Sequence, residues 1–158
     1  MISTWKARSV LANRLTRTST RFEHIDSTTG TPEALWACWT DVTTWSDWAG
    51  WVVSASIEGP FGPGTKGVVV QRDGRRSELL ITAVTPLVSH EFTVHVPGAD
   101  VHMRREILDA SQRTTFKHSV WLEGPLAGLW TRPLSARARV ELPETMRRLA
   151  AHTAAAYR

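Results

Sequence analysis

Hydrophobic and polar residues alternate through the middle of the chain, and this alternation predicts a β-sheet. In the segment WVVSASI, apolar side chains at every second position would share one face, and the two serines would share the other. These apolar residues are Trp51, Val53, Ala55 and Ile57. The remaining strands are expected at residues 20–28, 68–72, 75–84, 89–96, 101–108 and 114–122. Asp73-Gly74 is predicted as a two-residue hairpin turn, and residues 97–100 as the loop of the next hairpin.

Helix signals flank the alternating region. Gly30-Thr31-Pro32 supplies a turn, an N-cap and a proline at the first helical position, so a short helix is predicted through Trp39. Thr40 or Asp41 can cap a second short helix that ends near Trp48. Both helices would lie between the first and second strands.

The C-terminal part has apolar residues at intervals of three and four, which is typical of an amphipathic helix. The stripe consists of Leu126, Leu129, Trp130, Leu134, Ala138, Leu142, Met146, Leu149, Ala150 and Thr153. Pro133 and Pro143 are expected to kink or divide this helix. The predicted order is strand, two short helices, six strands and a long helix, an α+β class.

Five tryptophans fall between residues 36 and 51: Trp36, Trp39, Trp45, Trp48 and Trp51. Each ring hides roughly 150–250 Å² when it is buried, so a folded chain cannot leave all five in water. We expect most of them in the core. Trp48 and Trp51 would lie beside the mouth of any cavity.

Composition is that of an ordinary globular domain, with 42% hydrophobic and 22% charged residues among 158. We divide the chain into a basic N-terminal arm, residues 1–19, and a single domain, residues 20–158. The arm could also be an organelle transit peptide. No apolar run is long enough for a membrane-spanning helix, and scattered arginines do not favour nucleic-acid binding.

Cys38 is the only cysteine, so an internal disulfide is excluded and a reducing compartment is favoured. It lies in an apolar helical stretch, where a buried, inert thiol is expected. With no secretory h-region, the chain is expected to be cytoplasmic. The oligomeric state is left open.

The segments TPEALW, WTDVTTWSDW, EGPFGPGTKG and EGPLAGL, in this order of elements, resemble the SRPBCC superfamily of START-like, helix-grip proteins. The group includes polyketide cyclase/dehydrase-like and lipid-transfer proteins and the birch-pollen allergen. The resemblance covers about residues 20–155. It implies the helix-grip fold, in which a seven-stranded antiparallel sheet curls around the C-terminal helix and leaves a cavity. Pro133 departs from this pattern, because relatives usually continue the helix there.

Hairpin register predicts which side chains face that cavity. Closing the loop at residues 97–100 gives the pairs Val96–Val101, Val94–Met103 and Phe92–Arg105. His95 and His102 would then meet on the outer face. Two surface histidines without a third ligand are a weak metal signal, and neither a metal nor another cofactor is expected.

The neighbouring strands extend this inner face. The last strand would contribute Phe116, His118, Val120 and Leu122, with Arg105 across from His118. In the family arrangement the first strand borders the last, so Phe22, His24 and Asp26 would also face inward. His90 could stand at the rim.

An apolar lining with a few polar groups is typical of a ligand pocket. Expected ligand contacts are Trp48, Trp51, Val53, Phe92, Val94, Met103, Phe116, Val120, Trp130 and Leu134. A guanidinium in such a cleft must meet Asp26, Glu106, water or an anionic ligand. Arg105 could equally form an internal salt bridge or reach water at the mouth, and His118 could be a structural histidine.

Three functions remain open. The first is non-covalent binding of a small hydrophobic molecule such as a polyketide, aromatic compound or lipid. The second is a cyclase, aromatase or dehydratase, with Arg105 stabilising an enolate oxygen and His118 or His24 moving a proton. The third is an interaction module like the heat-shock chaperone activator. Its basis is the basic N-terminal arm together with the arginines beside the C-terminal helix: Arg137, Arg139, Arg147 and Arg148.

Overall fold

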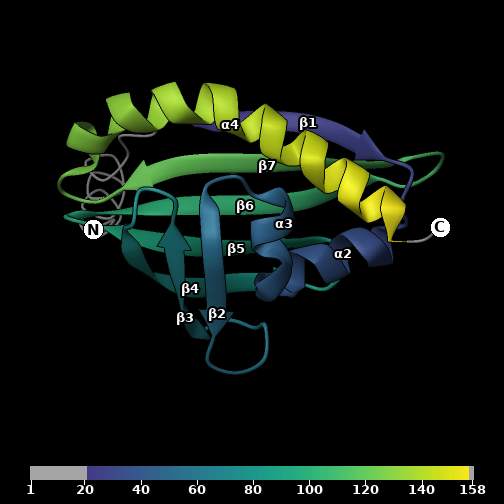
Figure 1. Cartoon of the computed structure of the whole chain (residues 1–158), viewed down its shortest axis with the longest axis horizontal. Helices are drawn as coiled ribbons and strands as arrows, with labels where there is room; N and C mark the ends of the chain where they lie inside the picture. The colour runs from purple at the N-terminus through teal and green to yellow at the C-terminus, as the bar shows by residue number, and fades with distance from the viewer. Residues whose placement is uncertain (1–20, 157–158) are drawn as a thin grey trace, which may run out of the picture.

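A computed structural model describes residues 21–156 and shows one antiparallel sheet with helices on one of its faces (Figure 1). The strands are β1 (Phe22–Thr28), β2 (Val52–Ile57), β3 (Lys66–Gln71), β4 (Arg76–Thr85), β5 (Ser89–Val96), β6 (Ala99–Asp109) and β7 (Thr114–Glu123). The helices are α2 (Pro32–Thr40), the 3-10 turn η1 (Val42–Thr44), α3 (Trp45–Trp48) and α4 (Ala127–Ala155). The predicted order of elements is confirmed. The basic arm, residues 1–19, lies outside the described residues.

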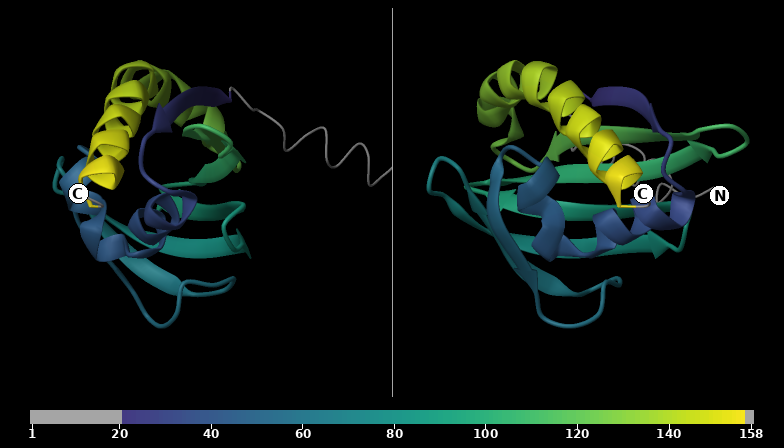
Figure 2. Two further views of the ribbon diagram at one scale, coloured as in Figure 1. Left: turned by 90° about the vertical axis from the view of Figure 1, so that its right-hand side faces the viewer. Right: turned by 45° about the vertical axis from the view of Figure 1, so that its right-hand side comes forward.

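The sheet order is β1-β7-β6-β5-β4-β3-β2. Strands β2 to β7 follow one another as antiparallel neighbours, and β1 completes the sheet beside β7, as expected. The sheet curves, and α4 runs across its concave face with α2 and α3 in the same layer (Figure 2). The predicted helix-grip class is therefore confirmed.

The short helices are set by their caps. The Thr31 hydroxyl accepts a hydrogen bond from the Ala34 amide at 3.1 Å, and Pro32 occupies the first turn. Asp41 ends α2 and caps η1, because its carboxylate accepts a bond from the Thr43 amide at 3.2 Å. The chain therefore turns between α2 and α3 within four residues, which brings both helices over one end of the sheet.

The predicted alternation is wrong at Val53. Pairing jumps from Val52 with Gln71 to Ser54 with Val70, so β2 carries one extra residue there. Such a bulge reverses the side-chain direction. Val52 is buried at 1% exposure, and Val53 points outward at 55%. Beyond the bulge, the expected face holds, since Ala55 and Ile57 pack against the core.

Two hairpin turns differ in length from the prediction. The Gln71 amide bonds to the Arg75 carbonyl, so three residues form the β3–β4 loop, with Gly74 at φ 84°. The β5–β6 hairpin turns at Pro97-Gly98 and pairs Val96 with Ala99. Its register is therefore shifted by two residues: the true pairs are Val94–Val101, Phe92–Met103 and His90–Arg105. A shift of two preserves each side chain's face, so the predicted inner face survives the error.

The two prolines do not divide α4, which is helical from Ala127 to Ala155 and arcs across the sheet (Figure 1). Pro133 deprives the Leu129 carbonyl of its usual partner, but Leu129 lies on the solvent side at 73% exposure. Hydroxyl bonds from Thr131 to the Ala127 carbonyl and from Ser135 to the Thr131 carbonyl support the same turns. The expected interruption at Pro133 is therefore wrong.

Candidate functional site

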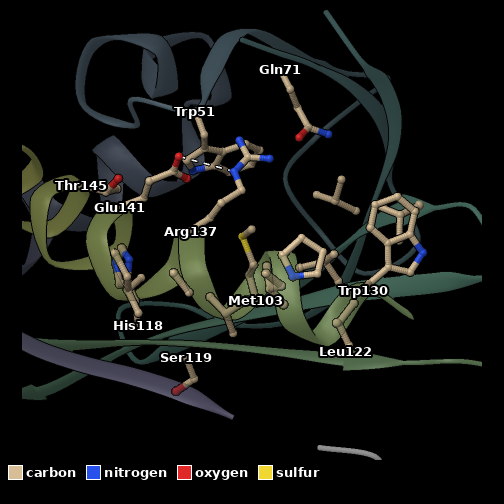
Figure 3. A pocket seen from close by; sticks show the side chains of 18 of the residues that line it. Trp51, Gln71, Met103, His118, Ser119, Leu122, Trp130, Arg137, Glu141 and Thr145 are labelled. Atoms are coloured by element: carbon tan, nitrogen blue, oxygen red, sulfur yellow. Dashed lines mark ion pairs between the residues drawn. The ribbon is translucent and has the colours of Figure 1, made fainter. Parts of the chain in front are cut away.

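A cavity of about 180 Å³ lies between the sheet and the first half of α4 (Figure 3). Strands β5, β6 and β7 form its apolar floor with Val94, Val96, Val101, Met103, Val120 and Leu122. Helix α4 covers it with Trp130, Pro133, Leu134, Ala138 and Leu142. Trp51 closes one side. A void of roughly 150 Å³ with apolar walls holds a benzene molecule, so this cavity is the size of one substituted ring.

Six of the predicted ligand-contacting residues line this cavity: Trp51, Val94, Met103, Val120, Trp130 and Leu134. Their roles in binding remain predictions. Two of the predicted catalytic residues, Arg105 and His118, are also part of the wall. The third, His24, is half-buried on β1 and does not line the cavity.

Four predicted contacts lie elsewhere. Val53 points away because of the bulge in β2. Trp48, Phe92 and Phe116 face inward but are fully buried, with 0% exposure, in the solid part of the core. There α2 and α3 pack against the sheet. The ring centres of Trp45 and Phe92 are 4.9 Å apart, and those of Trp39 and Phe116 are 6.1 Å apart. The mouth position expected for Trp48 is therefore wrong.

Four basic side chains form a row across the inner face of the sheet. The register places His90 opposite Arg105, Arg105 opposite His118, and His118 opposite His24. Directly opposed residues on one face lie about 4.5–5.5 Å apart at Cβ. The predicted Arg105–His118 pair is confirmed. His90 is not at the rim as expected, but is 1% exposed in the core.

Arg105 is only 3% exposed and lies in a cage of aromatic rings. Its guanidinium carbon is 4.7 Å from the centre of Trp45, 4.9 Å from Trp48 and 4.8 Å from Phe92. Cation–π attraction recovers part of the lost hydration, but burial still lowers the pKa of Arg105 to about 9. Nη1 has no hydrogen-bond partner among the described residues.

Neither carboxylate suggested as a partner of Arg105 fills that role. Glu106 points to the outer face and bonds Arg104 at 3.2 Å and Lys117 at 3.3 Å. The Asp26 carboxylate accepts a bond from the adjacent Ser27 amide. Within residues 21–156, no ion pair involves Arg105. Of the alternatives drawn from the sequence, an internal salt bridge and exposure at the mouth are both wrong.

The two inner histidines are held neutral. Burial, and then the Arg105 charge, hold the pKa of His118 and that of His90 well below the usual value. Nε2 of His118 and both ring nitrogens of His90 lack partners in the described part of the chain. His90 is surrounded by rings, with Phe61 at 5.0 Å and Trp39 at 5.5 Å. Only His118 of these two reaches the cavity, where its ring points toward α4 (Figure 3).

A polar network at the mouth was not anticipated from the sequence. Arg137 pairs with Glu141 at 3.5 Å and with Asp73 at 3.8 Å, which ties α4 to the β3–β4 loop. Arg75 lies 5.0 Å above the ring of Trp130. The four-residue spacing of Arg137 and Glu141 beside the apolar stripe was the available signal.

The outer histidines do not meet. His95 contacts Asp100 at 2.9 Å, and His102 contacts Glu123 at 3.3 Å. The two-residue register shift separates them. Over residues 21–156, no group of three or more His, Cys, Asp or Glu side chains could hold a metal ion.

In the same range, no helix is long and apolar enough to cross a membrane.

Of the four arginines predicted beside α4, three have acidic partners, and Arg139 has none among the described residues. Arg147 and Arg148 both bond Glu144, at 2.7 and 3.0 Å, and Arg137 has the two acidic partners described above. Cys38 is buried, and burial raises the pKa of its thiol. The other described arginines without an acidic partner are exposed, so Arg105 is the one buried arginine among the described residues that lacks one.

Known proteins resemble this chain in structure and not in sequence. No protein-family model matches it, and no curated protein sequence is significantly similar. Ara h 8.0201 aligns over 85% of this chain and 97% of its own, with 16% identity and a TM-score of 0.64. Protein MLL2253 from Mesorhizobium loti aligns over 87% and 98%, with 12% identity and a TM-score of 0.70.

Norcoclaurine synthase from Thalictrum flavum, solved in complex with dopamine and hydroxybenzaldehyde, aligns over 89% of both chains. Its identity is 12% and its TM-score 0.64. At such identities, likeness establishes the fold and leaves activity open. The chain therefore has the same fold as these structures, the helix-grip arrangement that the resemblance of its motifs implied.

Proposed function

We propose that this protein binds a small hydrophobic molecule, of about one aromatic ring, in the cavity beneath α4. The observation that carries the proposal is the cavity itself, with its floor of valine, leucine and methionine side chains and two tryptophans at its sides. Apolar walls with a few converging polar groups are the usual form of a ligand site. Its size, about 180 Å³, favours a single ring over a polyketide chain or a lipid.

The comparison with norcoclaurine synthase supports an aromatic ligand. That protein of the same fold was solved with dopamine and hydroxybenzaldehyde, which each have one ring. A longer ligand would have to pass the Arg137–Glu141 pair and extend into solvent. We therefore place aromatic compounds ahead of the lipids and polyketides that the family resemblance also suggested.

The two described methionines provide the test. Met103 lines the cavity, and Met146 is buried in the core with 0% exposure and does not line it. Titration with toluene should shift the ¹³C-methyl NMR signal of Met103 and leave that of Met146 in place. In Val120→Phe, a larger side chain fills the cavity and the toluene effect should disappear. An unchanged Met103 signal in the wild type would refute the proposal.

Catalysis is the second candidate, because Arg105 and His118 are cross-strand partners on the cavity wall. Arg105 could stabilise an enolate oxygen of a bound carbonyl compound. His118 is a weak base, because its pKa is held well below 6.5. Its neutral ring is therefore better suited to donating a hydrogen bond to the substrate oxygen than to abstracting a proton. Arg105→Ala and His118→Ala should each abolish turnover of a β-ketone substrate. Unchanged rates in both would remove this candidate.

A further inference from the structure

The inner face of the sheet carries a positive charge that the described part of the protein does not neutralise. Arg105 is buried, its nearest neighbours are three aromatic rings, and its Nη1 lacks a protein partner. His118, directly across the strand pair, has an unpartnered Nε2. A buried hydrogen-bond donor without a partner is costly, and a buried charge is more so. Both residues are part of the cavity wall.

The single carboxylate among the cavity-lining residues does not neutralise the charge of Arg105. Glu141 is on α4 and is paired with Arg137 at 3.5 Å (Figure 3). The aromatic cage compensates partially, because ring faces attract cations but accept no conventional hydrogen bond. The row therefore lacks an acceptor that is small, negatively charged and able to reach the floor of the cavity.

The walls define the rest of that molecule. Beyond Arg105 and His118 the floor is apolar, with Val101, Met103 and Leu122, and the flat rings of Trp51 and Trp130 stand at the sides. A ligand that fits both parts has an anionic group at one end and a ring at the other. One guanidinium beside neutral imidazoles balances one negative charge, which favours a carboxylate over a phosphate dianion.

Resting on the proposed function, we propose that the ligand is a small aromatic carboxylate, with its oxygens bound by the Arg105 guanidinium and the His118 ring. The ring then occupies the apolar part of the cavity against Met103 and Trp130. Arg105 sets the specificity for an anion, and the aromatic cage holds the guanidinium in place before the ligand arrives. A preorganised charge of this kind lowers the entropy lost on binding.

The experiment compares benzoate with toluene, its neutral analogue, and with acetate, which lacks the ring. Binding is followed by the Met103 methyl signal and by calorimetry. The wild type should bind benzoate at least tenfold more tightly than either analogue, as expected for a charge-assisted hydrogen bond in a buried site. Arg105→Met should weaken the binding of benzoate about 10- to 100-fold, and the affinity for toluene should stay within threefold of the wild type. Arg105→Lys, which keeps the charge, should restore part of the difference.

Arg104→Met is the matched control, because Arg104 is the next residue in β6 and faces outward. It should leave benzoate affinity within twofold of the wild type. If toluene binds and benzoate is no tighter, or if Arg105→Met leaves benzoate unchanged, the anion assignment is wrong and the cavity proposal stands. If no compound moves the Met103 signal, both proposals fail. The Met146 signal reports whether each variant is folded.

Discussion

Two neighbouring arginines of β6 lie on opposite faces of the sheet and have different kinds of partners. Arg104 faces outward and has two acidic partners, Glu91 and Glu106, each at 3.2 Å. Arg105 faces the helices, has no acidic partner among the described residues, and lies among three aromatic rings. The same residue type in the same strand thus meets a complete ionic network on one face and an incomplete one on the other.

The difference supports placing the proposed binding site on the inner face. The outer network is satisfied by the chain itself, so nothing further is needed to explain it. The inner row is costly to stability, and stability of native domains is small enough for such a cost to matter. Sites that depart from the rules of good packing are commonly sites of binding or catalysis. The following predictions test how far the two faces differ.

The largest effect is expected from removing a ring of the inner cage. Trp45→Ala should lower the free energy of unfolding by about 3–5 kcal/mol, because a fully buried ring and its contact with Phe92 are lost. On the outer face, Trp121→Ala removes a ring that stacks on His102 at 5.2 Å and should cost about 1 kcal/mol. Urea denaturation measures both. Equal losses would contradict the distinction between the faces.

The inner histidines should make the protein acid-sensitive. Both have a folded-state pKa well below 6.5, so the unfolded chain binds protons that the folded chain excludes. Stability therefore falls as the pH drops below about 6.5, by at most about 2 kcal/mol per histidine between pH 7 and pH 5. Above that window the contribution is constant.

His90→Phe and His118→Phe separate the two contributions. Each variant should lose about half of the acid sensitivity between pH 7 and pH 5, and the double variant most of it. His90→Phe should also be more stable at pH 7, because it removes two unpartnered ring nitrogens from an aromatic environment. A double variant as acid-sensitive as the wild type would show that other groups are responsible.

The smallest expected effect is that of replacing either arginine by methionine. The change in the free energy of unfolding should have opposite signs for Arg105 and Arg104. Burial disfavours the Arg105 charge by on the order of 5 kcal/mol, and three cation–π contacts at about 1 kcal/mol each return about 3 kcal/mol of this. Arg105→Met should therefore raise the free energy of unfolding by about 1–2 kcal/mol. Arg104→Met should lower it by under about 1 kcal/mol. If Arg105→Met destabilises the protein, the guanidinium is a structural element.

The fold could be predicted because its signals are local. Alternation, the Thr31-Pro32 helix start and the apolar stripe each specify an element without reference to distant residues. The inner face survived a wrong loop length between β5 and β6, since a shift of two residues conserves side-chain direction. The bulge at Val53 did change the predicted face, because a single inserted residue reverses the direction of the side chains.

The division of the inner face into core and cavity could not be predicted. It depends on where α2, α3 and α4 rest on the sheet, and no pattern within a strand records this. Phe92 and Val94 are alternate residues of β5 on one face, yet Phe92 is sealed under Trp45 and Val94 lines the cavity. The aromatic cage was missed for the same reason, since its rings come from α3 and β5 while Arg105 is on β6.

The most direct measurement is a crystal structure with 4-bromobenzoate, in which anomalous scattering locates the bromine. The account predicts bromine in the apolar part of the cavity beside Met103 and Trp130, with the carboxylate within hydrogen-bond distance of the Arg105 guanidinium and the His118 ring. Bromine at the mouth beside Arg75 or Arg137, or a cavity without the ligand at concentrations that saturate binding in solution, would contradict it.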